Sequence, residues 1–178
     1  MPRYVPYPAQ LREDSCPGEY QLVARQSRDV ASLRRAHETP CTRTKAESMI
    51  RALADEMLPP IDALALRVMW GTKRGRGGWL VERKREVRYV CKVTGRTYYR
   101  MRRTGRVTPY ISLPTLPMEQ GGPWWDGRSS RLRVGLVLHE FAHVLTFEDD
   151  GYHGSIFTAA LDDLVARWIS SPTATHAH

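Results

Sequence analysis

The sequence predicts a single α+β domain in which a small, mainly antiparallel sheet packs against a buried helix that is followed by a C-terminal helix. Apolar residues repeat with a helical period before residue 60, alternate with a period of two from Leu64 to Leu113, and return to a helical period from Leu132 onward. The chain of 178 residues has the length of one domain, and its 42% hydrophobic content is too high for a disordered protein.

The expected domain organisation follows from proline content and periodicity. Residues 1–19 contain four prolines and are expected to form an irregular N-terminal arm. Residues 20–171 are expected to form the domain, and residues 172–178 a flexible tail. Within the domain, residues 73–106 form a basic hairpin region, and residues 131–170 form two helices.

The first clear helix begins near residue 44. Thr44-Lys45-Ala46-Glu47 has the form of a capping box, in which the Thr44 hydroxyl and the Glu47 carboxylate each accept a hydrogen bond from a backbone amide. The apolar residues that follow recur at spacings of three and four, so a helix is predicted from here to Pro59-Pro60. A weaker helical pattern precedes it, from Tyr20 to Arg35.

The middle of the chain alternates apolar and polar residues as strands do. Strands are predicted at Leu64–Trp70, Val87–Val93, Thr97–Met101 and Val107–Leu113. The glycine-rich stretch from Lys73 to Gly78 is predicted to be a flexible turn, and Thr94-Gly95-Arg96 to be the turn of a hairpin. Pro109 lacks an amide hydrogen, which restricts the last strand to an edge or to an irregular role.

Two helices are predicted to close the domain. The first spans Leu132–Thr146, is apolar on nearly all sides and is therefore expected to be buried, with Ser129 or Ser130 as its cap. The second spans Ser155–Ser170 and carries one apolar stripe, with Pro172 beyond its end.

The positive charge is concentrated in one segment. The chain has 27 Lys and Arg residues against 19 acidic residues, and 13 of these basic residues lie between Lys73 and Arg106 with only two glutamates. One interpretation is the solvated face of a sheet, whose other face is buried. The other is a phosphate-binding face for nucleic acid, formed by Lys73, Arg74, Arg76, Arg100, Arg102, Arg103 and Arg106.

Several classes of protein are excluded or disfavoured. Three cysteines without a CxxC pair argue against a four-cysteine zinc ribbon and a disulfide scaffold. No apolar run approaches the ~20 residues of a membrane span, so no membrane partner is expected. The N-terminus lacks the apolar core of a secretory signal, so a cytoplasmic protein with reduced thiols is expected.

The predicted buried helix contains the sequence His139-Glu140-Phe141-Ala142-His143. Residues four apart on an α-helix lie on one face, so both imidazoles can reach one Zn²⁺ ion. Glu140 is rotated by about 100° from His139, outside the ligand set but beside the open side of the metal, where it can accept a proton from water. The alternative is a pair of buried core histidines that are hydrogen-bonded through Glu140.

A catalytic zinc site requires a third protein ligand and one open position. His153 is favoured, because Gly151 permits the chain reversal that brings it back to the metal and because the last helix begins directly after it. A carboxylate one helix later is the rival, and Asp162 and Asp163 are the candidates.

The stretch from Leu132 to Trp168 resembles the SprT-like zinc metallopeptidases, which include the SprT/Spartan group and phage-encoded relatives. The resemblance rests on the H-E-x-x-H sequence followed, after a short acidic loop, by His153-Gly154-Ser155-Ile156-Phe157 at the start of the next helix. It implies a zincin-like α+β fold, one zinc ion held by His139, His143 and His153, and Glu140 as the general base.

The expected function is therefore zinc-dependent hydrolysis of peptide bonds, with proteins bound to nucleic acid as one class of substrate. Tyr152 and Tyr110 are candidates for stabilising the transition state, with ordinary packing as the alternative for each. The extended segment Thr108–Leu113 is a candidate for pairing with the substrate backbone. The alternative function is a non-catalytic, basic nucleic-acid-binding or phage-assembly protein with a structural metal site.

Overall fold

The computed structural model describes residues 23–71, 75–114, 132–147 and 153–171. Within these ranges the labelled elements are α3 (Val30–Glu38), α4 (Arg43–Met57), α5 (Pro60–Ala65), β1 (Arg67–Trp70), β2 (Arg76–Val90), β3 (Thr97–Leu113), α6 (Val134–Leu145) and α7 (Ser155–Ser170). Helices combined with a small mixed sheet confirm the predicted α+β class. The predicted N-terminal arm (1–19) and tail (172–178) lie outside the described residues.

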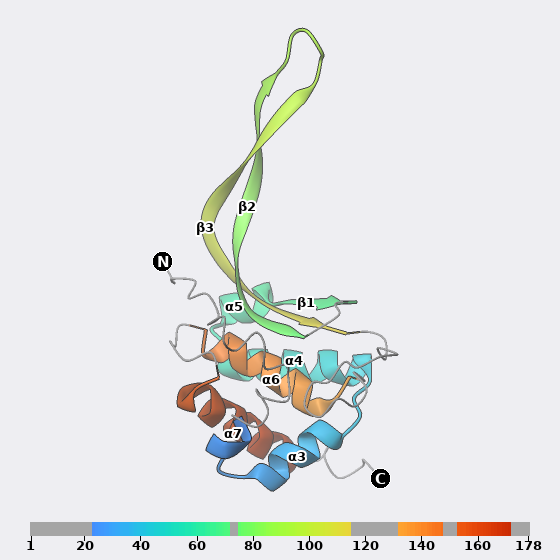
Figure 1. The fold of residues 1–178 in the computed structure, drawn as a ribbon, viewed down its shortest axis with the longest axis vertical. Coiled ribbons are helices and arrows are strands. Elements are labelled where there is room, and N and C mark those ends of the chain that lie inside the picture. Colours follow the sequence, from blue (N-terminus) through green and yellow to red (C-terminus); the bar gives the residue numbers. More distant parts are fainter. Residues whose placement is uncertain (1–22, 72–74, 115–131, 148–152, 172–178) are drawn as a thin grey trace.

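Helix α6 is the centre of the fold. It contacts β2 and β3 on one side and α3, α4 and α7 on its other sides, so the base of the sheet and the helices surround it (Figure 1). Every residue from Val134 to Val144 is buried, as the apolar sequence predicts. In the described part of the chain, no helix combines the length and the apolar character needed to cross a membrane.

The start of α6 is fixed by the chain segment that follows α3. The amide of Val134 donates a hydrogen bond of 3.0 Å to the carbonyl of Thr39, and the amide of Cys41 donates one of 2.9 Å to the carbonyl of Leu132. The N-cap residue is Arg133, which makes no side-chain cap, so the neighbouring segment takes the place of a capping side chain. The predicted caps, Ser129 and Ser130, lie outside the described residues.

Helix α4 begins slightly earlier than the sequence pattern predicts. Its N-cap is Thr42, whose side chain accepts a hydrogen bond from the amide of Lys45. Glu47 is paired with Arg43 at 3.0 Å on the helix surface, so the predicted capping box at Thr44 does not form. The predicted end of the helix before the two prolines is confirmed, because α4 ends at Met57.

The strand predicted at Leu64–Trp70 is half correct. Pro60 occupies the first turn of α5, where a fixed backbone angle and a missing amide hydrogen are tolerated, and α5 continues to Ala65. Leu64, expected to be buried on a strand, is 84% exposed. The strand β1 therefore consists of Arg67–Trp70 alone.

The sheet has the order β1-β3-β2 among the described strands, so β3 is a central strand, whereas the proline predicts an edge or an irregular role for Val107–Leu113. It pairs antiparallel with β2 along most of its length and parallel with β1 from Tyr110 to Leu113. Pro109 lies opposite Trp79 of β2, one residue before the pairing with β1 begins. The proline is tolerated because β3 has a neighbour on only one side at that position.

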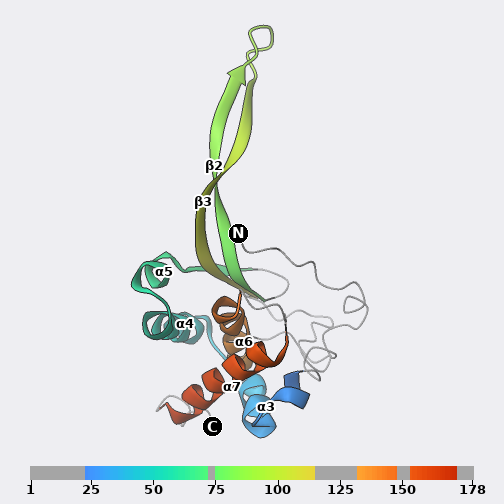
Figure 2. The same ribbon diagram turned by 90° about the vertical axis from the view of Figure 1, so that its left-hand side faces the viewer.

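The predicted hairpin is present, but its strands are far longer than the alternation indicates. Strand β2 already begins at Arg76, so the flexible turn predicted at Lys73–Gly78 is wrong for its last three residues. The outer parts of β2 and β3 extend away from the helices as a two-stranded ribbon (Figures 1 and 2), and residues 82–106 of this ribbon are called the arm below. Val87 and Val93 of the arm are 64% and 93% exposed, so the predicted buried face does not exist there.

Candidate metal centre

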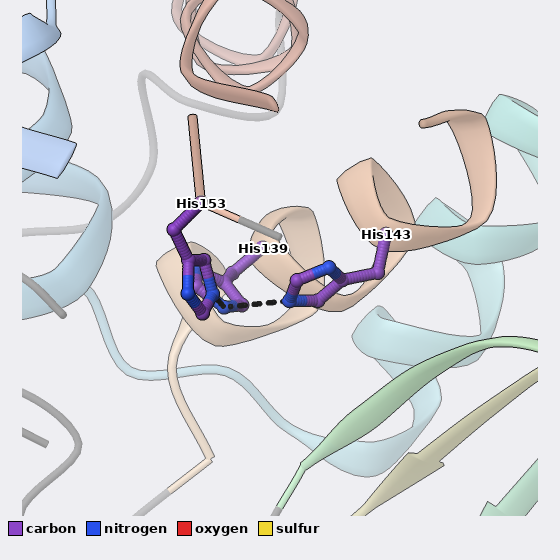
Figure 3. A group of neighbouring side chains, drawn as sticks. All are labelled: His139, His143 and His153. Carbon is purple, nitrogen blue, oxygen red and sulfur yellow. Dashed lines mark hydrogen bonds between the residues drawn. The ribbon is translucent and has the colours of Figure 1, made fainter. Parts of the chain in front are cut away.

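Three buried histidines converge at the junction of α6 and α7. His139 and His143 come from α6, and His153 directly precedes the N-cap of α7 (Figure 3). The Nε2 atom of His139 lies 3.2 Å from Nε2 of His143 and 3.2 Å from Nε2 of His153. The side chains are 1%, 8% and 6% exposed, in sequence order. The structure therefore brings together the three histidines that the sequence singles out.

The local sequence explains why these rings meet. His139 and His143 are one helical turn apart, so they lie on the face of α6 that contacts α7. Phe157, in the first turn of α7, packs against all three imidazoles, with ring centroids 4.9, 4.5 and 4.8 Å from those of His139, His143 and His153. This buried ring limits the rotamers of the three histidines and thereby preorganises the cluster.

Burial keeps the three imidazoles neutral. Desolvation lowers the pKa of His139 and of His143 well below its ordinary value, and the other imidazoles of the cluster add to this effect. Desolvation also lowers the pKa of His153 to about 4. A histidine binds a metal through a neutral ring nitrogen, so the protonation state of the cluster is the one that metal binding requires.

The geometry of the nitrogens fits a metal ion better than it fits hydrogen bonds within the cluster. An imidazole nitrogen has one in-plane position for a proton or a lone pair, whereas Nε2 of His139 faces two other nitrogens at 3.2 Å. With Zn–N bonds of ~2.0–2.1 Å, this separation corresponds to a ligand–metal–ligand angle of about 100–106°, which is close to tetrahedral. These three buried histidines could therefore hold a metal ion.

Glu140 is buried on a different side of α6, against the beginning of β2. Its side chain is 1% exposed, and a methyl group added at Gly75 would come within 2.5 Å of its Oε1 atom. A methyl group at Gly77 would overlap the backbone oxygen of Glu140. The glycines that the sequence indicates as a flexible turn therefore allow β2 to lie directly on the helix beside Glu140.

Trp79 fixes β2 in this position and was not singled out from the sequence. Its indole Nε1 donates a hydrogen bond of 2.9 Å to the carbonyl of Val144 near the end of α6. Trp79 lies two residues beyond Gly77, so this hydrogen bond adds to the close approach of Gly75 and Gly77 in holding the strand against the helix. The only sequence signal is a tryptophan directly after the Gly77-Gly78 pair.

His37 is a further buried histidine near the cluster, although it is distant in the sequence. It lies on α3, and a methyl group added at Gly135 of α6 would overlap its ring. Gly135 is four residues before His139, so the His37 ring lies about one helical turn from the cluster. Burial lowers the pKa of His37 to about 3. This residue is not part of the metal-binding group.

The rival ligands Asp162 and Asp163 are engaged elsewhere. Asp162 is buried on α7 and accepts hydrogen bonds from the Ser27 hydroxyl at 2.6 Å and from the Arg28 amide at 2.7 Å. Asp163 is paired with the Arg28 guanidinium at 2.6 Å on the surface. Both carboxylates anchor the segment before α3 to α7, and neither belongs to the histidine group.

The two tyrosines predicted as helpers have different outcomes. Tyr110 lies on β3 and is half-buried, and burial raises its pKa, with the positive charge of Arg76 opposing and the negative charge of Glu140 adding to the effect. It is therefore within electrostatic range of Glu140. Tyr152 lies outside the described residues.

The predicted basic residues do not form one surface. Arg76 lies at the base of β2, whereas Arg100, Arg102, Arg103 and Arg106 lie on the arm. Arg100 pairs with Glu86, ten residues along β2 from Arg76, which corresponds to about 33 Å of strand. Lys73 and Arg74 lie outside the described residues. The positive surface is therefore on the arm, away from the histidines.

Comparisons of the chain with protein-family models, with curated proteins and with solved structures give no match. The interpretation of the site therefore depends on its own geometry and chemistry.

Proposed function

We propose that the chain is a zinc-dependent metallopeptidase of the SprT-like type, which hydrolyses peptide bonds in proteins or peptides. The observation that carries the proposal is the convergence of His139 and His143 of the buried helix α6 with His153, which precedes α7, together with Glu140, the neighbour of His139 on α6. Zinc is proposed because three imidazoles with one open coordination position are a ligand set of catalytic zinc sites.

Bound zinc would polarise the scissile carbonyl and lower the pKa of a coordinated water towards ~7. The three imidazoles supply a preformed, neutral ligand set, because burial and the ring of Phe157 fix them before the ion arrives. Glu140 takes a proton from the attacking water and later delivers it to the leaving amine. Its burial beneath β2 excludes bulk water, which strengthens these electrostatic interactions.

The substrate is proposed to bind along the outer edge of β2 near Arg76–Val81. Among the described strands, β2 has a partner on one edge only, and its first residues lie on α6 beside Glu140. An extended peptide can add to such an edge through backbone hydrogen bonds. The segment Thr108–Leu113, predicted for this role, does not suit it, because from Tyr110 onward β3 is paired on both edges.

Tyr110 remains the candidate for stabilising the transition state, because Glu140 contributes to its electrostatic environment. If its hydroxyl contacts the developing oxyanion, Tyr110→Phe lowers kcat by ~10²–10³, as loss of one such donor does elsewhere. Metal affinity is expected to be unchanged.

The experiment that tests the proposal compares zinc-loaded wild type with Glu140→Gln on a mixed peptide library, with new termini detected by mass spectrometry. The wild type should cleave the peptides of the library. Glu140→Gln should keep zinc, but its rate of cleavage should be lower by a factor of ~10²–10⁴, the usual contribution of a general base. His153→Ala should lose both metal and cleavage. Absence of cleavage by the zinc-loaded wild type would overturn the proposal.

Glu140→Gln also distinguishes the peptidase from the alternative function, a non-catalytic protein with a structural metal. Structural zinc sites are usually closed by four protein ligands, whereas the group found among the described residues has three members. A structural site should be little affected by Glu140→Gln.

A further inference from the structure

The arm carries the whole net charge of the protein. Of the 27 basic and 19 acidic residues, 10 and 2 lie between Glu82 and Arg106, which gives this segment a charge of +8 and leaves the remainder neutral. The segment projects from the body as a two-stranded ribbon (Figures 1 and 2). A charge asymmetry of this size attracts anionic partners to the arm before any other part of the molecule.

The pairing of strands within the arm places like charges against each other. Arg83 is directly opposite Arg103, and Lys84 is directly opposite Arg102. Like charges in these positions destabilise a two-stranded ribbon. Glu86 compensates only partly, through an ion pair of 3.4 Å with Arg102. A polyanion bound to the ribbon would remove this repulsion.

The positive charge lies on both faces of the ribbon. Successive residues of a strand point to opposite faces, so the Arg83–Arg103 pair and the Lys84–Arg102 pair lie on opposite sides. A flat acidic protein or a lipid surface would contact one face and leave the other repulsive. A groove between two phosphate backbones would contact both faces at once.

The dimensions of the ribbon fit the major groove of one kind of duplex better than that of another. The major groove of B-form DNA is about 12 Å wide and admits a two-stranded ribbon. The major groove of A-form RNA is too deep and narrow for side chains to enter. The part of β2 within the arm, Glu82–Val90, spans about 30 Å, which is close to one turn of the duplex.

Aromatic contacts hold the ribbon in shape without a hydrophobic core. Tyr89 stacks on Tyr98 across the strands with ring centroids 4.9 Å apart, and the guanidinium of Arg85 lies 3.3 Å from the ring centroid of Tyr99. Cross-strand aromatic pairs stabilise a hairpin that would otherwise be only marginally stable. The arm is thereby ordered before it binds, which reduces the entropy lost on binding.

We propose that the arm is a DNA-binding element that enters the major groove of double-stranded DNA and contacts the phosphates on both sides. The binding is independent of base sequence to the extent that it consists of phosphate contacts. This inference goes beyond the proposed peptidase activity and does not depend on the metal centre.

The test measures the affinity of the full chain for a fluorescent, mixed-sequence duplex of about 20 base pairs, by fluorescence anisotropy at several salt concentrations. With six to ten phosphate contacts, the affinity should fall by ~10³–10⁵ between 50 and 200 mM salt. In Arg102→Ala/Arg103→Ala, the slope of log affinity against log salt should decrease in magnitude by about 1.8, which is 0.9 for each lost contact.

Two matched variants control for net charge and for folding. Arg25→Ala/Arg34→Ala removes the same charge from exposed positions on the helical body and should leave the slope unchanged. Arg102→Lys/Arg103→Lys keeps the charge on the arm and should restore the wild-type slope. The proposal would be overturned if the substitutions on the arm and on the body changed the salt slope equally, or if the affinity for DNA did not depend on the salt concentration.

Competing partners and the groove itself are tested in the same assay. Guanines methylated at N7, an atom exposed in the major groove, should weaken binding. Double-stranded RNA of the same sequence and anionic phosphatidylserine vesicles should compete poorly. Equal or stronger competition by either one, or indifference to N7 methylation, would overturn insertion into the major groove. Glu140→Gln should bind DNA as the wild type does, so failure of the peptidase proposal leaves this result unaffected.

Discussion

Acidification should destabilise the metal-free protein steeply, because four buried imidazoles must stay neutral in the folded state. The pKa of His37 is lowered to about 3 and that of His153 to about 4, and the pKa values of His139 and His143 are also well below the ordinary value. In the unfolded chain each titrates near ~6.5. Stability is therefore fully present above that pH and is lost as the pH falls below it, because the unfolded state binds more protons.

The size of the loss in stability follows from the number of protons that the unfolded state binds in excess of the folded state. One pH unit below the unfolded pKa, each histidine lowers the free energy of unfolding by between about 1 and 2 kcal/mol, so the four together lower it by roughly 5 kcal/mol between pH 7.5 and 5.5. A domain has only ~5–15 kcal/mol of stability, so this loss brings the protein close to unfolding. Carboxylates titrate mainly below pH 5.5, so the change in stability between pH 7.5 and 5.5 reports mainly on the histidines.

Urea unfolding of the full chain in the presence of a chelator, followed by circular dichroism at pH 7.5, 6.5 and 5.5, measures this loss. His37→Gln should reduce the difference in the free energy of unfolding between pH 7.5 and 5.5 by roughly 1 kcal/mol, since one buried imidazole no longer contributes. Stability that is constant or increases over this range would refute the assignment of neutral, buried histidines.

Two further substitutions, each with a control variant, test the surroundings of the site. Gly77→Ala should lower the free energy of unfolding by ~1–3 kcal/mol and reduce activity, because the new methyl group overlaps the backbone of Glu140; Val93→Ala on the exposed arm should change stability by less than ~0.5 kcal/mol. Asp162→Ala should lower the free energy of unfolding by ~1–3 kcal/mol in urea unfolding but keep the metal, because its carboxylate holds the segment before α3. Asp163→Ala, whose ion pair is on the surface, should cost less than ~1 kcal/mol. If Asp162→Ala lost the metal, the interpretation of Asp162 as a metal ligand would again have to be considered.

The convergence of the histidines could be predicted because it depends on local rules. His139 and His143 share a helical face, and His153 lies at the boundary of the helix that packs beside it, so short-range spacing brings the rings together. The burial of α6 and the bounds of α7 follow from apolar periodicity in the same way.

The sheet could not be predicted to the same extent, because strand order is set by contacts between distant residues. Pro109 lies one residue before the partner of Arg67, the first residue of β1, and this position, which no local pattern reveals, decides whether the proline is tolerated. The full length of the arm could not be predicted, because apolar and polar residues alternate only over parts of its strands, Val87–Val93 and Thr97–Met101, and none of its residues is buried. The closeness of His37 to α6 depends on Gly135, whose role is visible only in three dimensions.

The central claim is that three imidazoles hold one metal ion. The most direct test is metal analysis of the full chain after dialysis against zinc and then against metal-free buffer, for the wild type, His153→Ala and Glu140→Gln. The account predicts one zinc per chain in the wild type and in Glu140→Gln, and none in His153→Ala. A wild type without zinc, or a His153→Ala variant that retains it, would contradict the account.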